Sequence, residues 1–354
     1  MTIGENSCRL QGDKAASGPV PAVSVVMPVH DGMPFVDAGI ASVLKQDFSD
    51  FELVVGDDGS RDGTAAVCAR WAARDPRVRV VTRATKSGLS ASANWVIGHA
   101  RAPLIAVAHA DDLSHPTRLR RQVDLFEAHR DVVLIGAVAE GIDARGRVVH
   151  PPNLWRLRGP SIFAAFAHSL AMYRRDAFDA VGGYREAADY WEDIDLFWRL
   201  ARRGRVLVLT SVEGQYRHSP VSVRNRDDQD RLDDAADRAY RAAALIGAGQ
   251  DPDVVLTEPS PARISPRIFI AKSWIRVWAG QRSPAFVRLM RRGRLGFDRG
   301  SLVAIAFVGW AAVAPRSLRY LIQQVMRVRN RAMASQLAGR DHIEWQPFAG
   351  AADD

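Results

Sequence analysis

The chain has 354 residues, of which 47% are hydrophobic and 25% charged, as in ordinary folded proteins. Its two cysteines, Cys8 and Cys68, exclude a disulfide-rich secreted scaffold. Residues 1–21 lack the basic start and apolar middle of a secretory signal, so we expect a cytoplasmic protein. The longest apolar run, 302–314, would make about 20 Å of helix, too short for the roughly 30 Å core of a membrane.

The formal net charge of +8 is concentrated towards the C-terminus. Residues 263–340 hold 16 arginines and lysines and one acid, Asp298, so the rest of the chain is net acidic. Basic residues mixed with tryptophan and phenylalanine favour peripheral binding to an anionic membrane, at its inner face. Nucleic acid is the rival partner. No helix-turn-helix, zinc-finger or RNA-recognition motif supports it, so no nucleic-acid partner is expected. A third alternative is an arginine-rich helical cap packed on the rest of the protein.

Short β-branched runs alternate with helical patterns from the N-terminal side onwards. The pattern predicts strands over 23–28, 51–56, 77–81, 104–108, 132–138 and 206–209, and helices over 35–46, 64–74, 90–100, 117–129, 192–203 and 227–246. Strands that alternate with helices form βαβ units. We therefore expect an α/β fold with a mainly parallel central sheet flanked by helices.

Acidic residues follow two of the predicted strands directly. Asp57 and Asp58 open the segment 57–64 (DDGSRDGT), and Asp111 and Asp112 follow the strand over 104–108. Ligands bind at such strand ends in open α/β sheets. The first pair is suited to a nucleobase imide or ribose hydroxyls, and the second to Mg²⁺ or Mn²⁺ on a nucleoside diphosphate. The alternative for both pairs is that they serve only turns and helix caps.

A third acidic cluster, Glu192, Asp193 and Asp195, opens the helix predicted over 192–203. Acids at a helix start also complement the helix dipole, which is the structural alternative. The functional interpretation makes one carboxylate the general base that takes a proton from an acceptor hydroxyl. His218 follows the last predicted strand, where a lone histidine is more often structural than a ligand.

Taken together, these motifs resemble those of family-2 glycosyltransferases of the GT-A fold, from about residue 23 to residue 223. Each motif is weak alone, but six occur in the family's order with plausible gaps. They are 28–31 (PVHD), 57–64 (DDGSRDGT), 88–94 (GLSASAN), 182–186 (GGYRE), 192–196 (EDIDL) and 216–218 (YRH).

The resemblance implies that a sugar is transferred, with inversion, from a nucleotide-diphosphate sugar to a hydroxyl of a glycan or lipid-linked acceptor. A UDP-sugar is favoured, and cell-surface polysaccharide or glycolipid assembly is the expected setting. The resemblance makes Asp193 the base, with Glu192 beside it, and gives the metal, Mn²⁺ or Mg²⁺, to Asp111, His109 and His218. It assigns nucleotide-sugar binding to Pro28, His30, Asp31, Asp57, Asp58, Ser60, Asn94 and Asp111.

The metal motif departs from the family pattern, because D-x-D-D is usual and His109 stands at the first acid. A neutral imidazole still binds Mn²⁺ but adds no negative charge, so metal use is expected to tilt away from Mg²⁺. His109 is also the one feature that favours a degenerate, non-catalytic nucleotide- or sugar-binding domain. The retention of Asp111, Asp193 and His218 argues against that alternative.

Other nucleotide-binding enzymes fit the sequence poorly. A dehydrogenase needs G-x-G-x-x-G after the first strand, and a P-loop enzyme needs G-x-x-x-x-G-K-[ST]; neither is present. A nucleotidyltransferase usually has a glycine-rich basic loop after that strand, which is also missing. We therefore predict a flexible segment over 1–21, a GT-A catalytic domain over 22–225, a helix and linker over 226–262, and a basic helical extension over 263–354.

Overall fold

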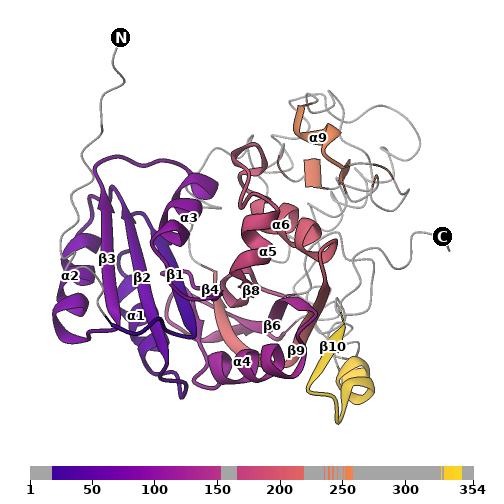
Figure 1. Cartoon of the computed structure of the whole chain (residues 1–354). Coiled ribbons are helices and arrows are strands. Elements are labelled where there is room, and N and C mark those ends of the chain that lie inside the picture. Colours follow the sequence, from indigo (N-terminus) through magenta and orange to yellow (C-terminus); the bar gives the residue numbers. More distant parts are fainter. Residues whose placement is uncertain are drawn as a thin grey trace, which may run out of the picture. The chain divides into compact units, whose positions relative to one another are not determined.

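The computed structural model describes residues 18–152, 166–218 and 331–344, together with Val328 and scattered residues from 235 to 257 (Figure 1). Most of the predicted N-terminal segment and most of the predicted basic extension lie outside the described residues.

The chain divides into two compact units. One is formed by Met1–Leu232 together with Gln336–Asp354, and the other by Asp233–Ser335. The first unit contains all the motifs of the predicted catalytic domain. It also includes the C-terminal residues, which the sequence analysis had grouped with the basic extension.

Four parallel strands form the half of the sheet that carries the first predicted motifs. They are β1 (Val23–Val29), β2 (Phe51–Asp58), β3 (Val78–Arg83) and β4 (Leu104–Val107), in the order β4-β1-β2-β3. Figure 1 shows β1, β2 and β3 side by side. The β-branched residues of β1 and β2 are buried on both faces, as in parallel sheets covered by helices. Because these strands are parallel, their carboxyl ends meet at one edge of the sheet.

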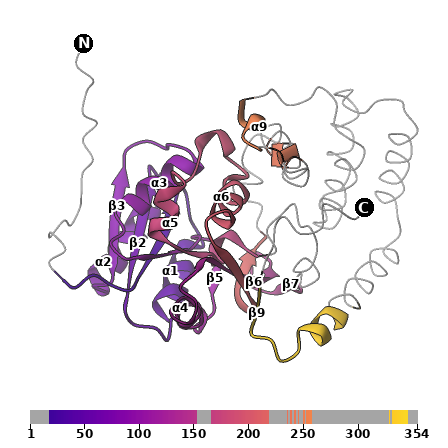
Figure 2. The same ribbon diagram turned by 45° about the vertical axis from the view of Figure 1, so that its right-hand side comes forward.

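Helices cover both faces of this half of the sheet (Figure 2). They are α1 (Val36–Leu44), α2 (Thr64–Arg74) and α3 (Leu89–Gly98). Leu53 and Val55 of β2 share one core with Ile40 of α1 and Cys68 of α2. Gly56 lies on the opposite face, where a Cβ atom would stand 2.1 Å from Cγ2 of Val96 in α3. The close approach of α3 therefore requires glycine at this position.

The other half of the sheet combines one long parallel pair with short antiparallel strands. Its strands are β5 (Leu113–Ser114), β6 (Val132–Ile142), β7 (Val148–His150), β8 (Met172–Arg174), β9 (Arg205–Arg217) and β10 (His342–Glu344). The sheet order is β10-β9-β6-β8-β4-β1-β2-β3, with β6 parallel to β9 and the three-residue β8 antiparallel to both neighbours. The predicted α/β fold is confirmed. The sequence analysis missed the short strands β5, β7, β8 and β10, and it ended β9 eight residues early.

Three further helices and two 3₁₀ turns lie in the described part of the first unit. They are α4 (Arg118–Ala128), η2 (His168–Leu170), α5 (Arg175–Ala180), η3 (Glu186–Ala188) and α6 (Glu192–Ala201). The predicted apolar face of α6 is buried, with Ile194, Phe197 and Trp198 each at most 7% exposed. This burial fixes the orientation of α6, whose first turn holds the acidic residues Glu192, Asp193 and Asp195.

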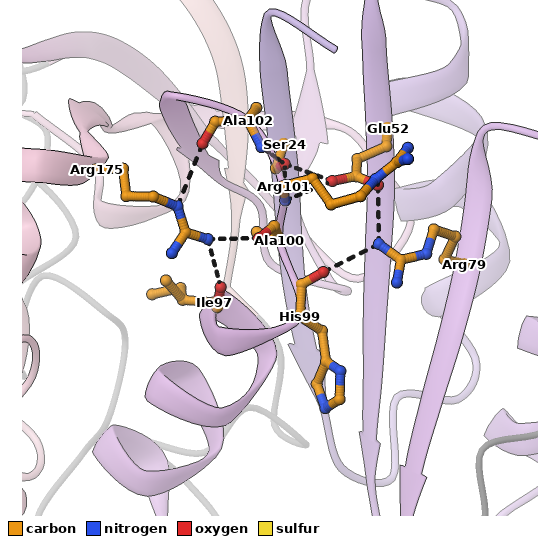
Figure 3. A network of polar contacts seen from close by, with 9 residues as sticks. All are labelled: Ser24, Glu52, Arg79, Ile97, His99, Ala100, Arg101, Ala102 and Arg175. Atoms are coloured by element: carbon orange, nitrogen blue, oxygen red, sulfur yellow. Dashed lines mark hydrogen bonds and ion pairs between the residues drawn. The ribbon is translucent and has the colours of Figure 1, made fainter. Parts of the chain in front are cut away.

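A buried ion-pair network ties the strands together at the edge opposite to the predicted site (Figure 3). Glu52, near the start of β2, is 2% exposed and accepts a hydrogen bond from Ser24 Oγ at 2.6 Å. Arg79 Nη1 and Arg101 Nε each donate to Glu52 Oε2 at 2.9 Å. Arg175 donates to three backbone carbonyls between 97 and 102, so the end of α3 is held to the same edge.

The described residues of the second unit include helical positions and one short helix, α9 (Val254–Thr257). Ala235, Ala239 and Ala242 are buried, and Arg238 Nη1 donates to Leu256 O at 3.2 Å. The sequence analysis had read the α9 segment as linker. Among the helices that the structure describes, none is both long enough and apolar enough to cross a membrane.

Candidate functional site

The loops after β1 and β2 hold each other in place at the carboxyl edge of the sheet. The Asp31 N–H donates to Ser60 Oγ at 2.9 Å, and Arg61 N–H donates to Asp31 Oδ1 at 2.8 Å. Asp31 itself has a φ of 51°, a left-handed conformation that aspartate tolerates better than most residues. Asp57 is buried and accepts a hydrogen bond from Ser60 N–H at 3.0 Å, so it shapes the turn. These contacts hold the predicted binding residues of the 28–31 and 57–64 motifs next to each other.

Asp58 and His30 lie next to each other at this edge of the sheet. The Asp58 carboxylate is 2% exposed and accepts hydrogen bonds from Ser87 N–H at 2.9 Å and from Ser87 Oγ at 3.0 Å. His30 Nδ1 lies 2.8 Å from the Asp58 backbone oxygen, which fixes the plane of its ring. Pro28 pairs with Gly56 inside the sheet, one residue before β1 ends. Sequence reasoning missed Ser87, which only its place beside the 88–94 motif would have suggested.

His109, Asp111 and Asp112 form a compact group in the loop after β4. One potential ligand atom from each lies within 4.8 Å of the others. The Asp112 carboxylate is buried and accepts hydrogen bonds from Ser169 Oγ at 2.6 Å and from Arg217 N–H at 2.8 Å. Arg217 Nε also donates to Asp111 O at 2.8 Å. The end of β9 therefore locks this loop against the sheet, and among the described residues the donor set fits a divalent cation.

The electrostatics of this group also favour a bound cation. Burial, and then the charge of Asp112, raises the pKa of the Asp111 carboxyl. Burial lowers the pKa of His109, but the adjacent Asp112 carboxylate and the other nearby charges outweigh this, so the pKa of His109 is raised. Negative charge around the two groups contributes to both shifts, and a metal ion would neutralise it.

A half-buried histidine, His168, and a buried tyrosine, Tyr184, lie next to His109. The His168 ring meets the His109 ring edge-on, with centroids 5.1 Å apart, and His168 Nε2 lies 2.7 Å from the Tyr184 hydroxyl. Burial, and then the proximity of His109, lowers the pKa of His168, so His168 is neutral. No sequence pattern marked His168. Tyr184 stood in the 182–186 motif but was not assigned a role.

The 88–94 motif clamps the segment that leads into α6. Asn94 Nδ2 donates to Tyr184 O at 2.8 Å, and Tyr184 N–H donates to Asn94 Oδ1 at 2.9 Å. Ser90 N–H donates to Asp189 Oδ1 at 2.9 Å, and Ser90 Oγ donates to Arg185 O at 3.0 Å. Asn94, which was predicted to bind the nucleotide sugar, is therefore bonded to the protein backbone in this structure, and its predicted role remains untested.

The acidic first turn of α6 contains three carboxylates in different environments. Asp195 is buried and bonded to Arg199, so it is structural. Asp193 Oδ1 accepts a hydrogen bond from Ile194 N–H at 2.8 Å. Burial, and then the charge of Asp193, raises the pKa of Glu192 to about 8. Glu192 Oε2 and Trp191 Nε1 are the two buried side-chain polar atoms without a partner among the described residues.

An electrostatic interaction between two side chains links α6 to the loop after β4. Glu192 acts on the pKa of His109, and His109 acts on that of Glu192, so the two side chains face one region. The structure thus brings Asp111, His109, Glu192 and Asp193 together, beside the strand ends that carry Asp31 and Asp58. His218 is placed differently: its ring lies against the rings of His150 and Tyr216, with centroids 4.9 and 5.1 Å away. Its metal role remains a prediction.

Comparison with known proteins agrees with this geometry. The sequence pattern of glycosyl transferase family 2 matches residues 24–182. The Bacillus subtilis (strain 168) protein "Putative glycosyltransferase EpsE" is 33% identical over 193 residues, covering 52% of this chain and 68% of EpsE. The chain belongs to glycosyl transferase family 2.

Other relatives match over similar lengths of this chain. Chondroitin synthase of Escherichia coli is 25% identical over 187 residues, covering 52% of this chain and 27% of the synthase. The O-antigen biosynthesis glycosyltransferase WbnJ of Escherichia coli is 29% identical over 183 residues, covering 50% of this chain and 71% of WbnJ. The resemblance to family 2 is thus confirmed, and the chain is a glycosyltransferase.

Solved structures show the shared GT-A fold of this family-2 enzyme. S. aureus TarS 1-349 in complex with UDP-GlcNAc superposes with a TM-score of 0.53 at 17% identity, covering 88% of each chain. Mannosyltransferase PcManGT from Pyrobaculum calidifontis, in complex with GDP-Man and Mn²⁺, has a TM-score of 0.50 at 18% identity, covering 91% of this chain and 88% of that one. At these identities the likeness concerns the fold alone.

Proposed function

We propose that this family-2 enzyme transfers a sugar, with inversion, from a nucleotide-diphosphate sugar to an acceptor hydroxyl in cell-surface polysaccharide or glycolipid assembly. The observation that carries the proposal is the convergence of the carboxylates after β1, β2 and β4 with the first turn of α6 at one edge of the sheet. A nucleotide, a metal ion and a base are all needed in such a reaction, and this edge offers residues for each. The names of the relatives, which include an O-antigen glycosyltransferase and a chondroitin synthase, support the setting.

Asp31 and Asp58 are the proposed contacts of the nucleoside. Asp58 accepts hydrogen bonds from Ser87 but keeps further lone pairs, because an ionised carboxylate can accept about four hydrogen bonds. These acceptors suit the imide N–H of uracil and the hydroxyls of ribose, so we favour a UDP-sugar. His30, held through Nδ1, presents a ring of fixed orientation beside them. A thermal-shift series with UDP-, GDP- and dTDP-sugars tests this choice, and a preference for GDP-sugars would contradict it.

His109 and Asp111 are the proposed ligands of Mn²⁺ or Mg²⁺. Their donor atoms and the negative charge around them fit such an ion. When bound, the ion neutralises charge on the diphosphate leaving group. The buried contacts of Asp112 and Arg217 hold the loop that carries these ligands.

Asp193 is the proposed general base. In a single displacement the acceptor oxygen bonds to the anomeric carbon while the bond from that carbon to the phosphate oxygen breaks, and Asp193 takes the hydroxyl proton. Attack opposite the leaving group inverts the anomeric centre. Glu192 is poorly suited to this role at neutral pH, because a pKa of about 8 keeps most of it protonated. As a neutral acid it is suited to donating a hydrogen bond to a sugar hydroxyl.

The test of this mechanism is Asp193→Asn, with Glu192→Gln as the matched control. Asparagine keeps the shape but cannot accept the proton, so donor binding measured by calorimetry stays near wild type while turnover is lost. Loss of a positioned general base typically lowers the rate by about 10² to 10⁴. Glutamine at 192 resembles the protonated acid and keeps most of the turnover. Wild-type transfer by Asp193→Asn would refute the assignment of the base.

A non-catalytic nucleotide- or sugar-binding domain is the second candidate, and His109 is the residue that favours it. Calorimetry with UDP and Mn²⁺, followed by an assay of donor hydrolysis, separates the two. Binding without hydrolysis or transfer of any donor supports the non-catalytic candidate, and turnover excludes it.

The basic segment 263–340 is proposed to bind an anionic membrane face near a lipid-linked acceptor. The support is its sequence, in which basic residues flank apolar and aromatic ones. Co-sedimentation of the full chain with anionic liposomes at low salt tests the idea, with neutral liposomes as the control. Equal sedimentation with both kinds of liposome, or with neither, would rule it out.

A further inference from the structure

The side chain that departs from the family's metal motif faces a carboxylate from the same loop, at ion-pair distance. His109 Nδ1 lies 3.6 Å from Asp112 Oδ2. A metal-binding imidazole almost always donates its second ring N–H to a carboxylate or carbonyl, which fixes the ring and makes the first nitrogen a better ligand. In His109 the nitrogen that does not face Asp112 is Nε2.

Asp112 is better suited to orienting His109 than to binding a metal itself. Its carboxylate is 4% exposed, and both oxygens are already engaged: Oδ2 by Ser169 Oγ at 2.6 Å and Oδ1 by Arg217 N–H at 2.8 Å. A metal bound to Asp112 would have to compete with both bonds. Asp111 differs, because among the described residues no other residue donates a hydrogen bond to its carboxylate.

The free side of the His109 ring is restrained as well. The His168 ring lies edge-on to it, with the two ring planes at 86°. His168 is itself held by the Tyr184 hydroxyl at 2.7 Å, and Tyr184 is held by the two backbone bonds to Asn94. His109 therefore lies between the carboxylate of Asp112 and the ring of His168, both of which are held in place by hydrogen bonds. A histidine that only replaced the usual acid, without a role, would not need its ring to be restrained on two sides.

We propose that Asp112 is a positioning residue that orients His109 so that its Nε2 binds the metal directly, beside Asp111, and that this nitrogen ligand makes the site select Mn²⁺ over Mg²⁺. The proposal rests on the proposed function in assuming that a metal–nucleotide complex binds at this edge. Mg²⁺ is a hard ion that prefers oxygen ligands, whereas transition ions such as Mn²⁺ accept imidazole nitrogen. Replacement of a carboxylate by an imidazole therefore weakens Mg²⁺ more than Mn²⁺.

The direct test is pulsed electron paramagnetic resonance of Mn²⁺ bound to the full-length protein with UDP. A directly bound imidazole imposes a ¹⁴N modulation on the Mn²⁺ echo, which oxygen ligands do not. We expect this modulation in the wild type and in His218→Ala, and its loss in His109→Asp. Mn²⁺ bound without ¹⁴N modulation in the wild type would overturn the proposal. Loss of the ¹⁴N modulation in His218→Ala but not in His109→Asp would also overturn the proposal, because it would identify His218 as the nitrogen ligand.

Metal affinity gives a second readout that is independent of activity. His109→Asp restores the usual carboxylate, so the ratio of Mn²⁺ to Mg²⁺ affinity, measured by calorimetry with UDP, should fall by about tenfold or more. An unchanged ratio would contradict the proposed selection. If the wild type bound neither ion, the metal part of the proposed function would fail together with this inference. If it bound Mn²⁺ and Mg²⁺ equally, only the inference would fail.

Ser169→Ala tests the positioning role of Asp112. It removes one of the two bonds that hold the carboxylate but leaves both His109 and Asp111 intact. We expect Mn²⁺ affinity to fall by about tenfold, as for other outer-shell partners, while the ¹⁴N modulation remains. A melting curve confirms that the variant is folded. Wild-type Mn²⁺ affinity in a folded Ser169→Ala protein would show that Asp112 needs no such support and would overturn its proposed role.

Discussion

Both ends of the Asn94 side-chain amide are bonded to the backbone of a single residue, Tyr184. The amide nitrogen donates at 2.8 Å, and the amide oxygen accepts at 2.9 Å. Asn94 lies in α3 and Tyr184 in the segment that leads into α6. Through this pair, a helix packed on β1 and β2 determines where the proposed base Asp193 is held.

Asn94→Ala should therefore impair turnover rather than nucleotide binding. The change leaves the N–H and C=O of Tyr184 without partners, which costs about 2 kcal/mol of unfolding free energy at roughly 1 kcal/mol for each bond. The first turn of α6 loses its support, so transfer falls while the dissociation constant for UDP stays unchanged. Urea unfolding and calorimetry with UDP measure the two quantities.

Asn94→Asp is a second variant that tests the same prediction with a side chain of nearly the same shape. Aspartate still accepts from Tyr184 N–H, but it sets a carboxylate oxygen against Tyr184 O in place of the donor. We expect it to lose transfer as Asn94→Ala does. A large loss of UDP affinity in either folded variant would favour the sequence-based prediction that Asn94 binds the donor.

Local patterns predicted most of the elements, and they failed where long-range pairing decides the structure. The helix over 64–74 and the start of β2 at Phe51 agree with the prediction, because β-branched and amphipathic runs are strong local signals. β8 has three residues, too few to display a period. β10 exists only because His342–Glu344 reaches the edge of β9, more than 120 residues away in the sequence.

The same limit applies to the site. Acidic motifs at strand ends were visible because parallel strands must place them at one edge. Ser87, Ser169, His168 and Asp189 stand in no motif that was assigned a role, and each acts through a partner from another part of the chain. Only the fold shows that Asn94 holds Tyr184. The residue types in the motifs predicted the chemistry of the site. The contacts that hold those residues in place could be found only in the structure.

Gly183 should tolerate alanine less well than its neighbour Gly182. Both have positive φ, 69° and 77°, so alanine at either position costs about 1 kcal/mol of conformational strain. A Cβ at Gly183 would also lie 2.8 Å from Asn94 Oδ1, whereas nothing lies within 4 Å at Gly182. We expect Gly183→Ala to show a larger loss of unfolding free energy and reduced transfer, and Gly182→Ala to keep its transfer. Equal effects of the two changes would mean that the Asn94 contact is unimportant.

Glu192 should make the protein less stable as the pH rises. Burial raises its pKa from the ordinary 4.5 to about 8, so between these values the folded state keeps a proton that the unfolded state has released. The stability contributed by this proton is fully present below about pH 4.5 and is lost progressively up to about pH 8. Glutamine does not titrate. In metal-free buffer, Glu192→Gln should therefore melt higher than the wild type at pH 8, by about 4 °C or more, and the difference should shrink towards pH 5.

A melting difference for Glu192→Gln that stayed constant from pH 5 to pH 8 would show that Glu192 titrates normally. The comparison uses metal-free protein, because a bound cation would stabilise the ionised carboxylate and reduce the effect.

Glu52 should be important for stability and unimportant for the reaction. Its carboxylate is buried at the edge opposite to the site and joins Ser24 of β1, Arg79 of β3 and Arg101 (Figure 3). Glu52→Gln removes the charge and leaves both guanidinium groups without their anion, and the breaking of a buried pair typically costs about 3 kcal/mol or more. Urea unfolding should show this loss, while the affinity for UDP and the turnover at low temperature stay unchanged.

The matched control for Glu52 is the exposed pair of Arg205 and Asp131, with side chains 39% and 60% exposed. Water screens such a pair, so Asp131→Asn should leave the unfolding free energy unchanged within error. If both variants unfolded like the wild type, the Glu52 network would add nothing to the fold. If Glu52→Gln instead lost UDP affinity in the folded state, the two edges of the sheet would be coupled, and the separation of stability from catalysis would be wrong.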